Sequence, residues 1–349
     1  MGNSKLRIAI TGLGNRALPK DPDSSNWDGW VKQIQNHPGY ELIAAHDPVE
    51  KNIDCRQYEH LSHMLFVESV DVLLVCSPIR YHDSGILAAL NSLRERGSRP
   101  TGLIVEKPFC WNIHQGEVLL EDIKELGVKT CIVQNWRFKD VGQTLRANLK
   151  NEEVAHIFFC YTRNRENPNY PDYIFKEPYP PLYAMGIHHL DLFRYILRDE
   201  VEWVTGQAFR PEWSLYESYT GVNLFLQMKS GVPVVYTSTF SSPGYDLNQE
   251  NLLIEGRGFD WNLLGDWGDG YLFMSTSQMN TPPKCLPFEK TKEQYDKADK
   301  YILDSFYETM IHGAPEICSA EDAFKSVLVV EAARKACETG EKVYIKELS

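Results

Sequence analysis

The chain of 349 residues has no long apolar run, no Cys-x-x-Cys pair and no excess of positive charge. A helix that spans a bilayer needs about 18 consecutive apolar residues, so we expect no membrane span. Nucleic-acid binding draws on a basic surface, and the formal net charge of -12 opposes it. The eight scattered cysteines indicate reduced, mostly buried thiols, so we expect neither disulfides nor a bound metal.

A recognisable targeting segment is also lacking near the amino terminus. The apolar stretch 6–10 is too short and too early for a secretory signal. Leu6 stands where a myristoylation motif requires serine or threonine. We therefore expect a cytoplasmic protein.

Length and patterning predict two domains, 1–138 and 139–349. The first alternates short apolar runs with helical patterns, which is typical of βαβ units around a parallel sheet. The expected strands are the apolar runs 6–11, 41–45, 72–76, 103–105 and 129–133. Segment 115–126 has the apolar spacing of a helix that stops at Gly127.

The second domain has longer strands and hairpin signals, which predict antiparallel sheet. Runs 222–228 and 232–240 flank the turn 229–231. Segment 161–183, rich in Tyr, Pro, Asn and Arg, is expected to form a long functional loop before a helix over 186–197.

A last helix is predicted over 320–337. Ser319 is its expected cap, with Asp322 at the third helical position, and Gly340 stops it.

A glycine-rich turn follows the first expected strand. Gly12, Gly14 and Ala17 fit the pattern G-x-G-x-x-A, whose backbone amides approach a pyrophosphate at a helix start. Asn15 and Arg16 lie inside this turn. An insertion over 18–26 interrupts the helix that should follow, and we expect the helix to resume over 27–34.

Asp47 stands at the end of the second expected strand, where an acid binds the adenine ribose hydroxyls. The alternative interpretation is a strand-end cap before Pro48. A carboxylate there repels the 2′-phosphate of NADP, and no arginine follows to accommodate that phosphate. NAD is therefore the favoured cofactor, with NADP as the second option.

The triplet Glu106-Lys107-Pro108 follows the apolar run 102–105 directly. Parallel sheets bind ligands at the carboxyl ends of their strands, and Pro108 keeps Lys107 in an extended conformation. Lys107 is thus a candidate catalytic residue. The alternative is a surface lysine whose stem lies along apolar surface.

Two adjacent histidines, His188 and His189, open the helix expected over 186–197. A histidine titrates near neutral pH and can hold a substrate hydroxyl and pass its proton. Neighbours on a helix point about 100° apart, so at most one faces a cleft well. The alternative is that both are partly buried residues with satisfied nitrogens.

Taken in order, these motifs resemble the Gfo/Idh/MocA family of NAD(P)-dependent oxidoreductases. The matching features are the glycine-rich turn, Asp47, Ser77-Pro78 with His82, Glu106-Lys107-Pro108, Asn135 with Arg137-Phe138, and Gly186-x-His188-x-x-Asp191. The resemblance implies an α/β fold, with a Rossmann dinucleotide-binding domain and a C-terminal α/β domain whose open sheet is mostly antiparallel. That second domain would bind substrate and form a homodimer or homotetramer.

The resemblance also assigns roles to residues. Those expected at the cofactor are Gly12, Gly14, Asn15, Arg16, Asp47, Ser77, Pro78, His82, Glu106 and Lys107. Lys107 and His188 take the positions of the family's catalytic lysine and histidine. The substrate is expected to meet Lys107, Asn135, Arg137, Arg163, Tyr183, His188 and His189, with Tyr161 as a further aromatic neighbour.

The implied reaction is hydride transfer between nicotinamide and a secondary alcohol or ketone of a sugar or cyclitol, a polyhydroxylated small molecule. Family dehydrogenases often carry an aspartate four residues before the histidine, and this chain has Ala184 there. Two alternatives therefore stay open. One is a non-catalytic NAD(P)-binding regulator, like the fungal repressor of galactose genes, and the other is a reductase of a non-sugar substrate.

Overall fold

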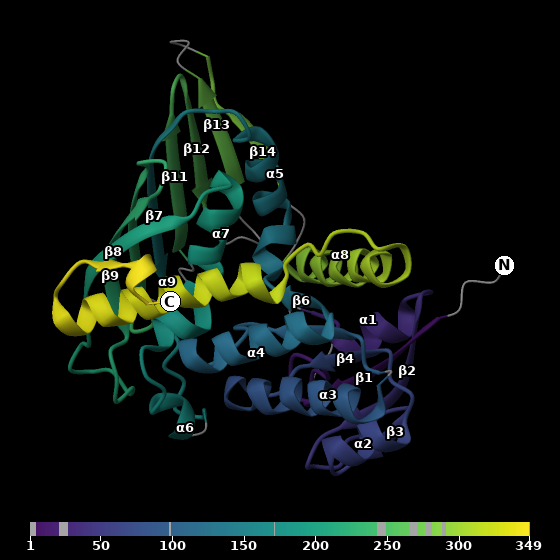
Figure 1. The fold of residues 1–349 in the computed structure, drawn as a ribbon. Helices are drawn as coiled ribbons and strands as arrows, with labels where there is room; N and C mark the ends of the chain where they lie inside the picture. The colour runs from purple at the N-terminus through teal and green to yellow at the C-terminus, as the bar shows by residue number, and fades with distance from the viewer. Residues whose placement is uncertain are drawn as a thin grey trace. The chain divides into compact units, whose positions relative to one another are not determined.

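The computed structural model describes residues 5–20, 27–97, 99–170, 172–242, 249–265, 271–276, 281–287 and 291–348. The chain folds into two compact units (Figure 1). One joins Met1–Phe138 to Lys292–Val327, and the other joins Lys139–Thr291 to Leu328–Ser349.

The first unit is built on a six-stranded parallel sheet in the order β3-β2-β1-β4-β5-β6. Its strands are β1 (Leu6–Thr11), β2 (Tyr40–His46), β3 (Arg56–Tyr58), β4 (Val72–Val75), β5 (Gly102–Glu106) and β6 (Lys129–Val133). The winding direction reverses between β1 and β4, and such a switch point opens a ligand crevice beyond the carboxyl ends of the strands. The predicted doubly wound α/β arrangement is confirmed.

Helices and short helical turns cover this sheet. They are α1 (Trp30–Asn36), α2 (Leu61–Val67), η1 (Ile79–Tyr81), α3 (His82–Arg96), α4 (Ile113–Leu126), η2 (Asn135–Phe138) and α8 (Thr291–His312). In Figure 1, α3 and α4 lie side by side. The α4 helix begins two residues before its predicted start, because the Asn112 side chain accepts a hydrogen bond from the Gln115 amide at 3.0 Å.

Backbone hydrogen bonds join the described residues on the two sides of the insertion in the glycine-rich turn. The Leu18 amide donates to Gly14 O at 2.8 Å, while the amides of Trp30 and Val31 donate to the carbonyls of Arg16 and Ala17 at 3.3 and 3.1 Å. The first residues of α1 thus lie beside Arg16 and Ala17. The helix begins at Trp30, three residues after the predicted start at Trp27. Residues 21–26 of the predicted insertion lie outside the described residues.

The second unit contains a nine-stranded sheet in the order β14-β13-β12-β11-β7-β10-β9-β8-β15. The strands are β7 (Val154–Thr162), β8 (Val201–Phe209), β9 (Gly221–Met228), β10 (Pro233–Thr239), β11 (Gln249–Gly256), β12 (Phe259–Leu264), β13 (Tyr271–Thr276), β14 (Lys284–Pro287) and β15 (Val343–Tyr344). Among the pairings described, β7 with β10 is parallel and the others are antiparallel. The predicted hairpin and the mostly antiparallel sheet are confirmed.

The helical elements of this unit are α5 (Asp140–Asn148), α6 (Asp172–Phe175), the π-helix η3 (Pro181–Gly186), α7 (Ile187–Leu197), η4 (Ile345–Glu347) and, beyond Val327, α9 (Ala320–Thr339). One sheet face packs against α7, where the rings of Phe159 and Phe193 lie 5.6 Å apart. The other face leaves Phe158 and Phe225 exposed. The expectation of a long loop over 161–183 is partly wrong, because β7, α6 and η3 all reach into it.

Segment 292–327 packs with the first unit through polar contacts from α8. The Tyr40 hydroxyl donates to Leu303 O at 3.0 Å, and His37 Nε2 lies 2.8 Å from Asp304 Oδ1. The guanidinium of Arg16 pairs with the fully buried carboxylate of Asp299. The first compact unit therefore includes segment 292–327, which the predicted division placed in the second domain. The domain boundaries 1–138 and 139–349 stay a prediction.

Two sequence expectations concern the whole chain. All eight cysteines lie within the described residues and are free thiols. Within the described ranges, no helix is both long and apolar enough to cross a membrane.

The Asp299 contact predicts a pH dependence of stability. Burial outweighs the attraction of Arg16 and raises the pKa of Asp299 from 3.8 to about 6. The folded state then holds this proton more tightly than the unfolded chain, so the contribution of Asp299 to the free energy of unfolding falls as pH rises through that window. Asp299→Asn removes the titration, so wild type should lose on the order of 2 kcal/mol relative to the variant between pH 3.8 and about 6.

Urea unfolding of both proteins across this pH range measures the difference. A difference in unfolding free energy that stays constant with pH would contradict the assignment.

Candidate functional site

The glycine-rich turn lies against the turn that follows β4. Gly12 has φ 88°, and a Cβ on it would lie 2.4 Å from the Ser77 amide nitrogen, so a side chain is excluded there. Around Gly14, by contrast, no described atom lies within 4 Å of a built Cβ. The turn thus presents open space beside backbone amides at the carboxyl end of β1.

Asp47 is tied to this turn through both carboxylate oxygens. Oδ2 accepts from the Leu13 amide at 2.7 Å and Oδ1 accepts from the Val49 amide at 2.9 Å. Asp47 therefore caps this turn, as the alternative interpretation expects. Each oxygen keeps a further lone pair, so the fixed carboxylate can still accept from ribose hydroxyls.

The His82 ring lies between the turn after β4 and the turn after β5 at this edge of the sheet. Its Nδ1 lies 2.8 Å from Pro108 O and its Nε2 lies 2.8 Å from Ser77 O. Burial lowers its pKa, so the ring is neutral at physiological pH and donates from one nitrogen only. The sequence places His82 at the cofactor; here it connects the Ser77-Pro78 turn to the turn that carries Lys107.

The residues around the switch point fit a dinucleotide. The Ser77 hydroxyl oxygen is buried and has no hydrogen-bond partner among the described residues, and the Ser77 backbone lies against Gly12 of the glycine-rich turn. An orphaned buried hydroxyl and a side-chain-free turn are what a bound pyrophosphate or ribose would satisfy.

Arg16 is directed toward protein groups of the first unit. Its Nε lies 3.0 Å from Glu106 Oε1, and its guanidinium stacks over the Trp30 ring at 4.9 Å. Trp30 Nε1 donates to the same Glu106 oxygen at 2.8 Å, and Asp299 completes the cluster. The sequence missed Trp30 and Asp299, because a contact across 283 positions leaves no local signal.

Lys107 follows Glu106 at the carboxyl end of β5 and is half-buried. Its positive charge contributes, after burial, to the lowered pKa of His82, which places the two residues in the same electrostatic environment. The strands β1, β4 and β5 are neighbours, so the turns carrying Gly12, Ser77 and Lys107 end at one edge of the sheet.

The turn after β6 carries further polar side chains. The Asn135 Oδ1 atom is buried and lacks a hydrogen-bond partner within the described part of the chain. The same holds for both amide atoms of Gln134, a residue that the sequence did not single out although it directly follows the strand.

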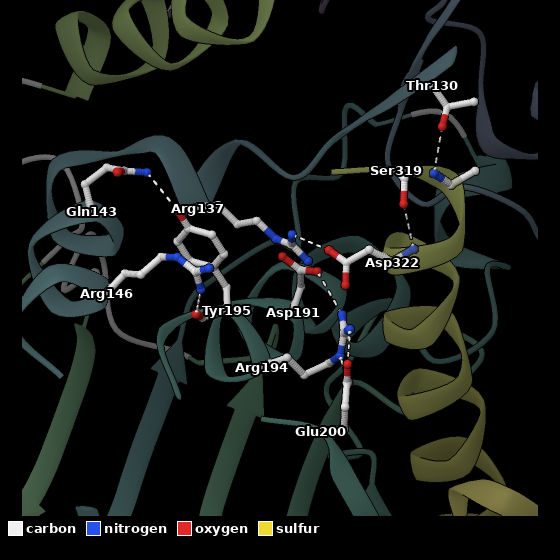
Figure 2. A network of polar contacts seen from close by, with 11 residues as sticks. Thr130, Arg137, Gln143, Arg146, Asp191, Arg194, Tyr195, Glu200, Ser319 and Asp322 are labelled. Atoms are coloured by element: carbon white, nitrogen blue, oxygen red, sulfur yellow. Dashed lines mark hydrogen bonds and ion pairs between the residues drawn. The ribbon is translucent and has the colours of Figure 1, made fainter. Parts of the chain in front are cut away.

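Arg137 is held inside the first unit. Its Nη1 donates to Asp322 Oδ2 at 2.5 Å, as Figure 2 shows. The Asp322 amide donates to Ser319 Oγ at 3.2 Å, which confirms the predicted helix cap. The Ala320 amide donates to Thr130 Oγ1 at 2.9 Å and fixes the same turn to β6.

The two adjacent histidines of the second unit occupy different environments. His189 is fully buried, with Nδ1 2.9 Å from the Tyr236 hydroxyl and its ring 5.1 Å from that of Tyr161. It therefore belongs to the core between α7 and the sheet. His188 lies on the first turn of α7 and keeps 6% of its surface exposed.

The other predicted substrate residues of this unit have protein partners. The Tyr183 hydroxyl donates to Glu331, and burial together with this carboxylate raises the pKa of Tyr183. Arg163 Nη2 lies 3.5 Å from the buried Glu250 carboxylate.

Asp191 lies on α7 itself, three residues after His188, and its side chain is buried. Its Oδ1 lies 3.5 Å from Arg194 Nη1, and Arg194 makes two bonds to Glu200, at 2.6 and 3.0 Å (Figure 2). Across the described ranges, no group of three or more His, Cys, Asp or Glu side chains could hold a metal ion.

Comparison with known proteins finds one matching domain model and two curated relatives. Residues 143–257 match the model of the GFO/IDH/MocA C-terminal domain. A curated relative, the myo-inositol 2-dehydrogenase of Thermotoga maritima, is 24% identical over 313 residues, which cover 84% of this chain and 85% of the relative. The D-glucoside 3-dehydrogenase of Escherichia coli is 27% identical over 210 residues, or 56% of this chain and 55% of that protein.

Solved structures share the fold over nearly the whole chain. An oxidoreductase from Agrobacterium radiobacter in complex with NAD+, L-tartaric acid and magnesium has a TM-score of 0.80 at 17% identity, covering 99% of this chain and 100% of the other. The transcriptional regulator Gal80p from Kluyveromyces lactis also has a TM-score of 0.80, at 13% identity and with 99% and 92% coverage. The matched domain and these relatives make the chain similar to the Gfo/Idh/MocA family, which the order of its sequence motifs also resembles.

Proposed function

We propose that the protein is an NAD(P)-dependent dehydrogenase or reductase that transfers a hydride between nicotinamide and a secondary alcohol or ketone of a sugar or cyclitol. The observation that carries the proposal is the position of Lys107. Lys107 directly follows β5, at the same edge of the sheet as the glycine-rich turn after β1 and the Ser77 turn after β4. The two curated relatives, named for inositol and glucoside oxidation, support the substrate class.

The cofactor supplies the hydride chemistry, and the protein orients the groups and moves the proton. Lys107 is proposed to take the proton of the substrate hydroxyl during oxidation. A neutral amine is needed for that step, and the positive nicotinamide of the oxidised cofactor favours it by like-charge repulsion. His188 is proposed to hold a substrate hydroxyl and to pass its proton.

Within the first unit, the groups that would hold the cofactor are those around the switch point. The amides of Gly14, Asn15 and Arg16 are proposed to meet the pyrophosphate, because those of Gly12 and Leu13 donate to His46 O and Asp47 Oδ2. Ser77 offers its hydroxyl, and Asp47 offers carboxylate lone pairs. The Arg16 and Glu106 side chains would act indirectly, because they are bonded to each other and fix the two turns.

A second candidate function is a regulator that binds NAD(P) without turnover. Ala184 in place of the family aspartate favours it, and a transcriptional regulator is among the structural neighbours. The retained Lys107 and His188 oppose it, since a binder needs neither proton donor nor acceptor. Turnover decides between the two functions.

We expect Lys107→Met to keep NADH binding and to lower kcat by about 100-fold or more, the usual loss for a general acid–base group. Steady-state rates with inositols, sugars and their keto forms, beside NADH fluorescence titration, measure both effects. Lys32→Met is a matched control, because Lys32 is an exposed lysine paired with Asp28. An unchanged kcat would make Lys107 structural, and cofactor binding without turnover by wild type would favour the regulator.

Asp47→Asn is expected to relax the preference for NADH over NADPH. The amide keeps an oxygen acceptor for the Leu13 or Val49 amide but removes the charge that repels a 2′-phosphate. The ratio of dissociation constants for the two cofactors should move toward 1. If the ratio does not change, Asp47 is a cap and not a ribose ligand.

The open face of the nine-stranded sheet is proposed to pair subunits as a homodimer or homotetramer. Cross-strand register aligns Phe225 with Val235, Val235 with Phe158, and Phe158 with Leu253, which makes an apolar row on that face. Covering exposed apolar surface of this kind drives association.

Phe225→Lys should therefore shift the protein toward the 40.1 kDa monomer in sedimentation velocity. Val118→Lys, at an exposed apolar site on α4 of the other unit, should not. A wild-type monomer would refute subunit pairing.

A further inference from the structure

Arg165, two residues after Arg163, has an unusual electrostatic position in the second unit. Its side chain is half-buried, and its Nε atom is buried with no hydrogen-bond partner among the described residues. Nη2 donates to the Tyr161 hydroxyl at 3.0 Å and approaches Met185 Sδ at 3.8 Å, while the guanidinium lies 5.6 Å from the Phe240 ring centre. Within the described ranges it forms no ion pair with a carboxylate.

Two other arginines of this unit have carboxylate partners within ion-pair distance. Arg163 pairs with Glu250, and Arg194 pairs with Glu200 and Asp191. A guanidinium cannot discard its proton to escape a partly dry environment, so it needs an anion or water. Among the described residues, no carboxylate lies within ion-pair distance of the Arg165 guanidinium.

This charge lies beside the turn that carries His188. Met185, which Arg165 touches, precedes His188 by three residues, and residues three apart lie on one face of a helix. Ala184, four residues before His188, is the position where dehydrogenases of the family often carry an aspartate. Here a methyl group replaces that negative charge, while Arg165 brings a positive charge to the side chain of the following residue, Met185.

We propose that Arg165 binds a carboxylate of the substrate, so that the protein acts on a sugar acid or cyclitol acid in preference to a neutral sugar. The proposal rests on the proposed dehydrogenase function and specifies its substrate class. Guanidinium and carboxylate form strong charge-assisted hydrogen bonds, and the negative charge absent at Ala184 would then come from the ligand.

Charge balance favours a carboxylate over a phosphate. One unbalanced guanidinium matches a monoanion, whereas a phosphate carries close to two charges and Arg163 is already paired with Glu250. Burial raises the pKa of Tyr161 to about 12, so its hydroxyl is neutral and holds the Arg165 fork by accepting from it.

Equilibrium binding tests the proposal without requiring turnover. Calorimetric titrations of the full chain with NAD would compare three hexuronates with their neutral primary amides, and glucose with glucose 6-phosphate. Wild type should bind at least one acid about tenfold or more tightly than its amide, the expected effect of a hydrogen bond to a charged group. Arg165→Met should bring this ratio near 1, and Arg165→Lys, which keeps the charge without the fork, should give an intermediate ratio.

Arg257→Met is the matched control, because Arg257 is 81% exposed and paired with Glu153. It should keep the wild-type ratio, and circular dichroism of each variant verifies folding. The proposal is overturned if wild type binds no acid more tightly than its amide, if Arg165→Met and Arg165→Lys both keep the ratio, or if glucose 6-phosphate is the preferred anion.

Failure of this proposal and failure of the proposed function give different results. Selective binding of acids without any turnover would remove the dehydrogenase and leave the Arg165 site. Equal oxidation of acids and neutral sugars would keep the dehydrogenase and remove the Arg165 site.

Discussion

The close approach of Gly12 to Ser77 is the constraint from which the rest of the first unit's site follows. A Cβ on Gly12 would stand 2.4 Å from the Ser77 amide nitrogen. Because glycine has no Cβ, the backbones of the turns after β1 and β4 can lie in contact. His82 then carries the contact onward to Pro108 O, next to Lys107. A cofactor turn and a candidate catalytic lysine are thus connected by short contacts within one rigid sheet edge.

Local patterns predicted the parts of the fold whose stabilisation is local. The strands Leu6–Thr11 and Lys129–Val133 have the predicted bounds, because each is a short apolar run buried in a parallel sheet. The last helix starts at Ala320 behind the predicted Ser319 cap. Segment 292–327 could not be assigned to the first unit in this way, since its polar contacts join residues more than 260 positions apart.

The structure shows which polar atoms of the predicted site residues already have protein partners. The family resemblance placed Arg16, His82 and Glu106 at the cofactor, and the structure shows protein partners for both ring nitrogens of His82, for Glu106 Oε1 and for the Arg16 guanidinium, whose Nη1 alone is buried without a partner in the described residues. Gln134 gave no motif, yet both of its amide atoms are buried without a partner within the described residues. Hydrogen-bond satisfaction is a three-dimensional property, so a sequence can suggest which residues are polar and buried but not which of them await a ligand.

A structure of the full protein with NAD bound would test the central claim most directly. The account predicts the pyrophosphate at the turn beside Gly14, the adenine ribose at Asp47, and the nicotinamide ring next to Lys107, with Lys107 Nζ about 3 to 4 Å from the reacting substrate hydroxyl. A nicotinamide ring far from Lys107, or a cofactor bound elsewhere than at the carboxyl ends of β1 and β4, would contradict it.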